Sequence, residues 1–182
     1  MKLRLVALLN IISFYSYSQD SAQKAQHFNL DEYINRVNGK QFGQFEIKSS
    51  GATSFSNANL AGKVVFVNFW FAGCPPCISE LEGFNRLYDT LENNRDFMFL
   101  SFTFDPDSTT QNLKDRYGIK YHVFHIERTE CYRLNFNMGF PASFVLDKKG
   151  VVRYCKVGGH VDIPKSTNAI FADIYPKIIG QL

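Results

Sequence analysis

One segment of the chain limits the possible folds more than any other. A nearly continuous apolar run, 63–70, is followed closely by the sequence Cys74-Pro75-Pro76-Cys77. The run is rich in β-branched and aromatic residues, which is typical of a central strand buried on both faces. After the cysteine pair, apolar side chains recur at the spacing of an amphipathic helix, namely Ile78, Leu81, Phe84, Leu87, Tyr88 and Leu91. The segment therefore predicts two cysteines at the junction of a buried strand and a helix.

The chain continues to alternate between strand and helix patterns. A second apolar run predicts a buried strand over 97–104, a helix is expected over 109–117 with Gly118 as its stop, and a minor strand over 121–126. Two further strands, 140–147 and 151–157, flank a turn and predict a hairpin. This order indicates an α/β domain with a mixed central sheet flanked by helices.

The two ends of the chain carry weaker patterns. Asp162 is expected to cap a final helix, in which Pro176 predicts a kink or an early end. Near the other end, glycines and short alternation over 39–60 predict a hairpin at a sheet edge. Residues 19–38 are polar, with one weak helical pattern, and form an expected N-terminal extension. We place the main domain at 39–182.

The first 18 residues have the pattern of a secretory signal peptide. Lys2 and Arg4 precede an apolar stretch, and small residues follow at positions suited to cleavage after Ser18. The stretch is too short for a membrane-spanning helix. We therefore expect export to the periplasm or cell envelope, where disulfides persist.

Composition narrows the function class. The chain has 182 residues, of which 45% are hydrophobic and 20% charged, as in a single soluble globular domain. Loss of Lys2 and Arg4 leaves 18 of the 20 basic residues against 17 acidic ones, so the mature chain is close to neutral. Basic residues are scattered, which argues against nucleic-acid binding. A monomer is the expected state.

The position of Cys74 determines its chemistry. Unpaired N–H groups and the positive end of the helix dipole favour an anion at a helix N-terminus. Because the thiolate is the reactive form of cysteine, Cys74 is predicted to attack a disulfide, and Cys77 to resolve the mixed disulfide that forms. Pro76 removes one N–H donor from the first turn, which favours a reducing protein over a strongly oxidising one.

The remaining cysteines, Cys131 and Cys155, leave two possibilities open. They either pair with each other or stay as buried thiols, and the sequence does not decide between these. A structural zinc site usually needs four ligands. Since these cysteines are single and widely separated, we expect no metal site, and no cofactor beyond the redox-active pair.

Together these residues resemble the thioredoxin superfamily, and in particular its exported TlpA/ResA-like thiol–disulfide oxidoreductases. The resemblance covers roughly residues 39–180 and rests on 65–70, on the cysteine motif, on 139–147 and on 157–159. It implies a thioredoxin-like fold, protein thiols and disulfides as substrates, and a membrane-bound electron donor. It also implies that Pro141 is cis and faces the cysteines, and that Phe140 and Pro141 pair with an extended substrate. Trp70 is a further candidate for substrate contact.

The sequence departs from the thioredoxin pattern at two positions. Asn68 stands where many thioredoxins have a buried, titratable Asp. Asp105 or Asp107 is a candidate substitute acid/base, although either also fits a turn beside Pro106. Glu80 is a third candidate, although it also suits the first turns of a helix as a favourable charge. The second departure is Gly73, which replaces an aromatic residue and is expected to open the surface beside Cys74.

Two other functions compete with thiol–disulfide exchange. A thiol peroxidase of the same superfold needs Ser or Thr three residues before its reactive cysteine, and Phe71 occupies that position here. A non-catalytic module that binds a metal or an apoprotein through the same cysteines is the other alternative. Tight metal binding with negligible disulfide exchange would support the latter.

Overall fold

The computed structural model describes residues 29–48 and 54–182. One compact unit, Ile34–Leu182, contains the sheet and the cysteine pair. The other unit, Met1–Tyr33, has only its last residues described, and they begin helix α2 (Leu30–Val37). That helix matches the weak pattern found in the sequence. The predicted signal peptide, residues 1–18, lies outside the described residues, and the domain boundary at 39 stays a prediction.

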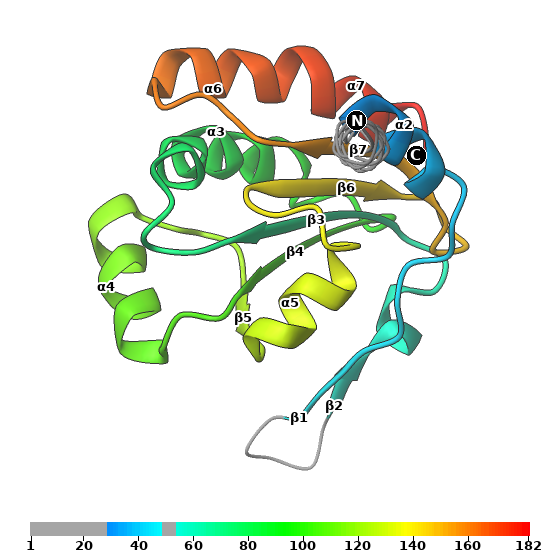
Figure 1. Cartoon of the computed structure of the whole chain (residues 1–182), viewed down its shortest axis with the longest axis horizontal. Helices are drawn as coiled ribbons and strands as arrows, with labels where there is room; N and C mark the ends of the chain where they lie inside the picture. Colours follow the sequence, from blue (N-terminus) through cyan, green and yellow to red (C-terminus); the bar gives the residue numbers. More distant parts are fainter. Residues whose placement is uncertain (1–28, 49–53) are drawn as a thin grey trace, which may run out of the picture. The chain divides into compact units, whose positions relative to one another are not determined.

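A five-stranded mixed sheet organises the main unit (Figure 1). Its order is β5-β4-β3-β6-β7, formed by Val123–His125, Phe97–Thr103, Val64–Trp70, Ala142–Leu146 and Val152–Val157. Strands β3, β4 and β5 are parallel, whereas β6 and β7 form the predicted antiparallel hairpin. Every residue of β3 is buried, as its continuous apolar sequence predicts.

Helices cover both faces of this sheet. Helix α3 (Pro75–Leu91) and the C-terminal helices α6 (Ile163–Ala169) and α7 (Tyr175–Ile179) lie on one face, and α5 (Arg128–Leu134) lies on the other (Figure 1). Helix α4 (Asp107–Tyr117) connects β4 to β5 and ends at Gly118, whose φ of 60° is left-handed. Glycine adopts this conformation without steric cost. The predicted stop at Gly118 is therefore confirmed.

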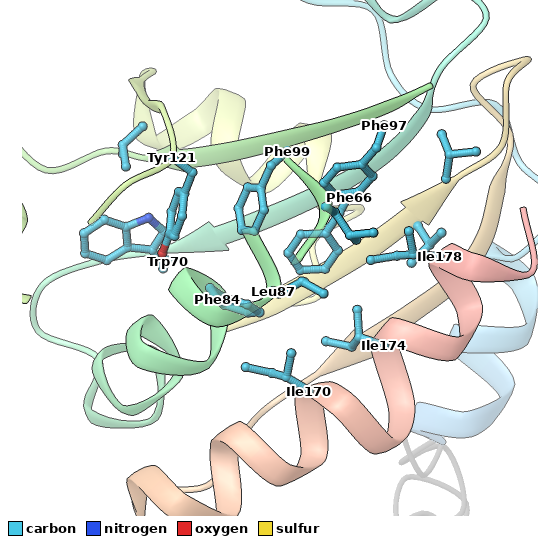
Figure 2. Close-up of a cluster of buried hydrophobic side chains, with 14 of the residues drawn as sticks. Phe66, Trp70, Phe84, Leu87, Phe97, Phe99, Tyr121, Ile170, Ile174 and Ile178 are labelled. Atoms are coloured by element: carbon cyan, nitrogen blue, oxygen red, sulfur yellow. The ribbon is translucent and has the colours of Figure 1, made fainter. Parts of the chain in front are cut away.

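The core is aromatic on both sides of the sheet, because alternate residues of a strand point to opposite faces. Toward α3, Phe66 packs edge-on against Phe99 at 4.8 Å between ring centroids. Figure 2 shows this side, where the isoleucines of the C-terminal helices face the sheet. On the opposite face, Phe69 stacks on Phe102 at 5.2 Å. Nine phenylalanines among the described residues are buried in this two-sided core.

One expectation is corrected by the structure. Strands β1 (Glu46–Lys48) and β2 (Ser54–Ser56) form the predicted hairpin, but as a separate two-stranded sheet. The segment just before it, 39–42, lies along the edge of the main sheet instead, through an isolated bridge between Gln41 and Val151.

At Pro176 the sequence predicts a kink or an early end, and the helix is interrupted just before this residue without ending there. Proline lacks the N–H that an α-helix needs, and a π-helical turn, Ile170–Ile174, precedes it. The N–H of Tyr175 bonds to the carbonyl of Ile170 at the end of that turn. The chain then continues into α7 with Pro176 in its first turn.

Candidate active site

The two motif cysteines lie where β3 leads into α3. Cys74 is the N-cap residue of α3 and is bonded to Cys77 in a disulfide, with the two Cα atoms 5.2 Å apart. The N–H of Cys77 donates to Cys74 Sγ at 3.3 Å. Because Pro75 and Pro76 lack N–H groups, Cys77 supplies the first amide donor of the helix. Both cysteines are nearly buried, with Cys74 the more exposed at 5% against 1%.

Asp105 holds the loop that leads into Cys74. Its Oδ2 accepts hydrogen bonds from the N–H of Ala72 at 2.6 Å and from Thr103 Oγ1 at 2.9 Å. These contacts give Asp105 a positioning role toward the loop. Asp107 is exposed and lies in the first turn of α4, where a negative charge is favourable. An acid/base role for either residue stays a prediction.

Glu80 occupies a different environment from the one its sequence position suggests. Only 4% of the residue is exposed, and its Oε2 has no hydrogen-bond partner among the described residues. A Cβ atom at Gly159 would lie 2.8 Å from Glu80 Oε1 and 3.4 Å from the Pro141 ring, so the carboxyl group lies beside both residues. Burial raises the pKa of Glu80 to about 8, against the opposing charge of Lys156. The carboxyl is therefore no exposed helix-end charge, and it can hold a proton near neutral pH.

A wall of the site beside Glu80 carries the expected cis-proline. The Phe140–Pro141 peptide bond is cis, as the resemblance implies. Before it, Asn135 Nδ2 donates to the carbonyl of Gly139 at 2.9 Å, and after it the carbonyl of Pro141 accepts from the N–H of Gly158 at 2.9 Å. The loop is thus fixed from both sides. Asn135 is a supporting residue that sequence reasoning missed, because asparagine is mostly exposed in folded proteins.

Partly exposed aromatic side chains extend this wall. Phe140 lies edge-on to Phe71 at 5.4 Å, to Phe104 at 5.5 Å and to Tyr132 at 5.2 Å. The Arg128 guanidinium lies 4.5 Å above the Phe104 ring. Gly73 has the ring of Phe71 beside it, since a Cβ atom there would lie 3.3 Å from that ring. We call Phe71, Phe104, Tyr132 and Phe140 the aromatic wall.

Trp70 does not belong to the exposed surface. Its side chain is completely buried, and its Nε1 donates to Ser101 Oγ at 2.8 Å. Figure 2 places the indole beside Tyr121 inside the core. The prediction that Trp70 contacts a substrate is therefore wrong for this structure, because strand β3 remains buried up to its last residue.

The other two cysteines are separate buried thiols. Burial, helped by the charges of Asp105 and Glu130, raises the pKa of Cys131 to about 12. Burial raises the pKa of Cys155 to about 11. Since a reactive cysteine needs an accessible thiolate, neither residue has the environment of an exchanging thiol.

Comparison with known proteins agrees with this geometry. Residues 38–155 match the AhpC/TSA family. The chain is 27% identical over 159 residues to the thiol-disulfide oxidoreductase ResA of Halalkalibacterium halodurans, covering 87% of this chain and 86% of that protein. A crystal structure of a thioredoxin-family thiol:disulfide interchange protein from Chlorobium tepidum is 26% identical, with a TM-score of 0.57 over 74% of this chain and 96% of that one.

A second structure supports the fold alone. It is a Chlorobium tepidum protein described as thiol:disulfide interchange protein DsbE. The two chains are 20% identical with a TM-score of 0.64, and the match covers 78% of this chain and 97% of that chain. The thioredoxin-like fold expected from the sequence is therefore confirmed.

Proposed function

The chain belongs to the AhpC/TSA family, and from this membership and the site geometry we propose that it is a thiol–disulfide oxidoreductase that reduces disulfides in client proteins. The observation that carries the proposal is the Cys74–Cys77 disulfide at the start of α3, in a chain whose Phe140–Pro141 bond is cis. A helix N-terminus favours the thiolate that exchange requires.

The reaction consists of two exchanges between sulfur atoms. The Cys74 thiolate attacks one sulfur of a client disulfide, and the other client sulfur leaves as a thiolate. Cys77, once deprotonated, attacks Cys74 Sγ and releases the second client sulfur. Two electrons pass from the protein to the client, and the protein ends with its own disulfide. No group beyond the two cysteines is needed for electron transfer.

Glu80 is our candidate for the proton acceptor from Cys77. The two residues are three positions apart on α3, which places them on one face of the helix. Its pKa of about 8 leaves a fraction of the Glu80 carboxyl groups ionised near neutral pH. This ionised form can take the proton of Cys77 and return it afterwards. Asn68 on β3 cannot titrate, so it cannot accept this proton. Glu80 on the neighbouring helix would take over that role.

The reducing direction rests on the small number of donors at Cys74. Because both prolines lack N–H groups, the N–H of Cys77 is the first amide of α3 that reaches the sulfur. A protein becomes a strong oxidant when its reduced form is stabilised. Fewer donors stabilise the thiolate less, which favours the oxidised protein and makes the dithiol a better reductant.

The client backbone is expected to pair with the segment at Phe140 and Pro141 by strand addition. The protein then needs a dithiol donor to restore its own thiols, and we propose a membrane-bound one outside the cytoplasm. The N-terminal pattern supports export to the periplasm or cell envelope. None of the helices in the described part of the chain has the length and hydropathy of a membrane span. A monomer would suffice, since both cysteines lie in one chain.

The test is the reduction potential of the mature protein, measured by equilibration with thiol buffers and counting of free thiols. Cys74→Ser and Cys77→Ser are the controls. A value near that of thioredoxin, roughly −270 mV, fits the proposed reductant, whereas a value near roughly −120 mV would reverse the proposed direction. The absence of any reversible two-electron couple at this pair would overturn the proposed function.

A further inference from the structure

A hollow of about 380 Å³ lies directly beside the cysteine pair. Gly73 and Pro75, the two neighbours of Cys74 in the sequence, form part of its lining. Ligand pockets range over about 300–1,000 Å³, so the hollow is at the small end. It belongs to the same surface as the reactive sulfur, on a side built by α3, the end of α4 and the start of α6. Its lining consists of Ala72, Gly73, Pro75, Ile78, Ser79, Tyr117, Val161 and Ile163.

The chemistry of the lining is uncharged. Apolar groups predominate, and the side-chain hydroxyls of Ser79 and Tyr117 are the polar exceptions. Arg116 directs its guanidinium over the Tyr117 ring at 5.2 Å and is not part of the lining. A charged occupant would lose its hydration here without gaining a partner, whereas an apolar occupant loses nothing.

The rim exposes large apolar side chains to solvent. Val161 is 74% exposed and Ile163 is 40% exposed. The described residues hold three other exposed large hydrophobic side chains, and none of these lines the hollow. Two neighbouring apolar side chains at the rim of an apolar hollow mark an interaction site.

Hydrogen bonds fix the rim in place before anything binds. Ser79 Oγ donates to the carbonyl of His160 at 2.7 Å, and Ser166 Oγ donates to the same carbonyl at 2.9 Å. The segment that carries Val161 is therefore tied to both α3 and α6. On the other side, Asn85 Nδ2 donates to the carbonyl of Tyr117 at 3.0 Å, which ties the end of α4 to α3. Preorganisation of this kind reduces the entropic cost of binding.

We propose that this hollow receives an apolar side chain of the client polypeptide, within two residues of the client cysteine that Cys74 attacks. The proposal rests on the proposed function, since the occupant is a client in disulfide exchange. Gly73 joins the hollow to the aromatic wall, since it lines the hollow and has the ring of Phe71 beside it. A client chain that crosses Cys74 therefore meets apolar surface on the hollow side, and a client cysteine among apolar residues is the substrate class that fits.

The experiment uses the reduced, mature protein and symmetrical disulfides of short synthetic peptides. Each peptide carries one cysteine. One position, at one or two residues before or after this cysteine, is varied and holds Leu, Ala, Asp or Lys. The measured quantity is the second-order rate constant for loss of protein thiols. For at least one position we expect the Leu peptide to react about tenfold faster than the Asp peptide.

Val161→Asp tests the hollow itself, and Ile179→Asp is the matched control. Both side chains are exposed, and Ile179 does not line the hollow. In Val161→Asp the preference for Leu over Asp should fall toward unity, whereas Ile179→Asp should keep it.

A wild-type protein that reduces all peptides at one rate would overturn this inference and leave the proposed function intact. So would a preference that survives Val161→Asp. Failure to reduce any peptide disulfide would instead refute the proposed function. A concentration-dependent dimer that Val161→Asp dissociates, seen by sedimentation, would assign the hollow to a second copy of the chain and overturn the inference.

Discussion

Replacing Glu80 by glutamine should change the pH dependence of stability by an amount that the structure sets. An unfolded chain releases this proton near pH 4.5, whereas burial raises the pKa of the folded chain to about 8. Between these values the folded chain holds a proton that the unfolded chain lacks. Its free energy of unfolding therefore falls by about 1.4 kcal/mol for each pH unit that the pH rises. Over the whole interval the loss is about 5 kcal/mol.

The glutamine amide stays neutral throughout this interval, so Glu80→Gln avoids the loss. The free energy of unfolding of the variant, minus that of the wild type, should grow by about 3 to 4 kcal/mol between pH 5 and pH 8, because Glu80 is partly titrated at both ends of this interval. The absolute offset at pH 5 depends on the hydrogen bonds that the amide makes, and only the growth with pH tests the argument. Titrating groups that do not interact with Glu80 are common to both proteins and cancel in the difference.

The assay is urea unfolding at pH 5, 6.5 and 8, followed by the fluorescence of Trp70, the single tryptophan. Both proteins are kept oxidised, so that neither Cys74 nor Cys77 titrates. Glu82→Gln changes an exposed carboxyl on the same helix and should leave the profile unchanged. If the difference between Glu80→Gln and the wild type is the same at pH 5 and pH 8, burial does not oppose the Glu80 charge. The proposed proton acceptor would then lose its basis.

Three further predictions concern the exchange reaction. Cys77→Ser should accumulate a mixed disulfide between Cys74 and a client, visible by mass spectrometry under non-reducing conditions. Cys74→Ser should form none. A mixed disulfide trapped by Cys74→Ser would instead make Cys77 the attacking cysteine and Cys74 the resolving one. Gly159→Ala should slow exchange several-fold because its Cβ would lie 2.8 Å from Glu80 Oε1. Since Gly159 is exposed, the unfolding free energy of this variant should differ from that of the wild type by no more than about 1 kcal/mol. An unchanged exchange rate would argue against a role for the Glu80 carboxyl. Hydrogen peroxide should be consumed no faster than by a free thiol, because Phe71 supplies no hydroxyl beside the cysteine; faster turnover would revive the peroxidase alternative.

The sequence predicts the sheet well because its strands carry their own signal. Strand β3 is buried on both faces and therefore reads as an unbroken apolar run. Helix α5 was not predicted, since it has only seven residues, of which only Cys131 and Leu134 are buried, and its N-cap makes no side-chain hydrogen bond. The hairpin β1–β2 was predicted, but its place was not. Alternation shows that a strand has one buried face, and says nothing of which sheet it joins.

The sequence predicts the parts of the candidate site that one contiguous segment forms by itself. Cys74 and Cys77 follow from a strand, a turn and a helix that are contiguous. The burial of Glu80 does not, because the groups beside its carboxyl include Gly159 and Pro141, which are 79 and 61 positions away in the sequence. Helical position alone favours an exposed charge in the early turns of α3. Only the fold brings the glycine and the proline over that charge.

The environments of Cys74 and Glu80 connect the direction of electron flow with the supply of protons. At Cys74, the two prolines leave the Cys77 N–H as the first amide donor, so the thiolate receives little help from the helix. At Glu80, burial raises the pKa of the carboxyl to about 8, so below that pH most molecules carry no negative charge at this residue. As the pH rises through this value, the carboxylate forms and disfavours a neighbouring thiolate. Deprotonation of the dithiol and of Glu80 are therefore coupled, and they titrate as a set rather than as single residues. Glu80→Gln should consequently shift the apparent pKa of thiol reactivity downward, which the pH dependence of alkylation of the reduced protein measures directly. An unshifted alkylation profile would show that the carboxyl and the sulfurs do not interact.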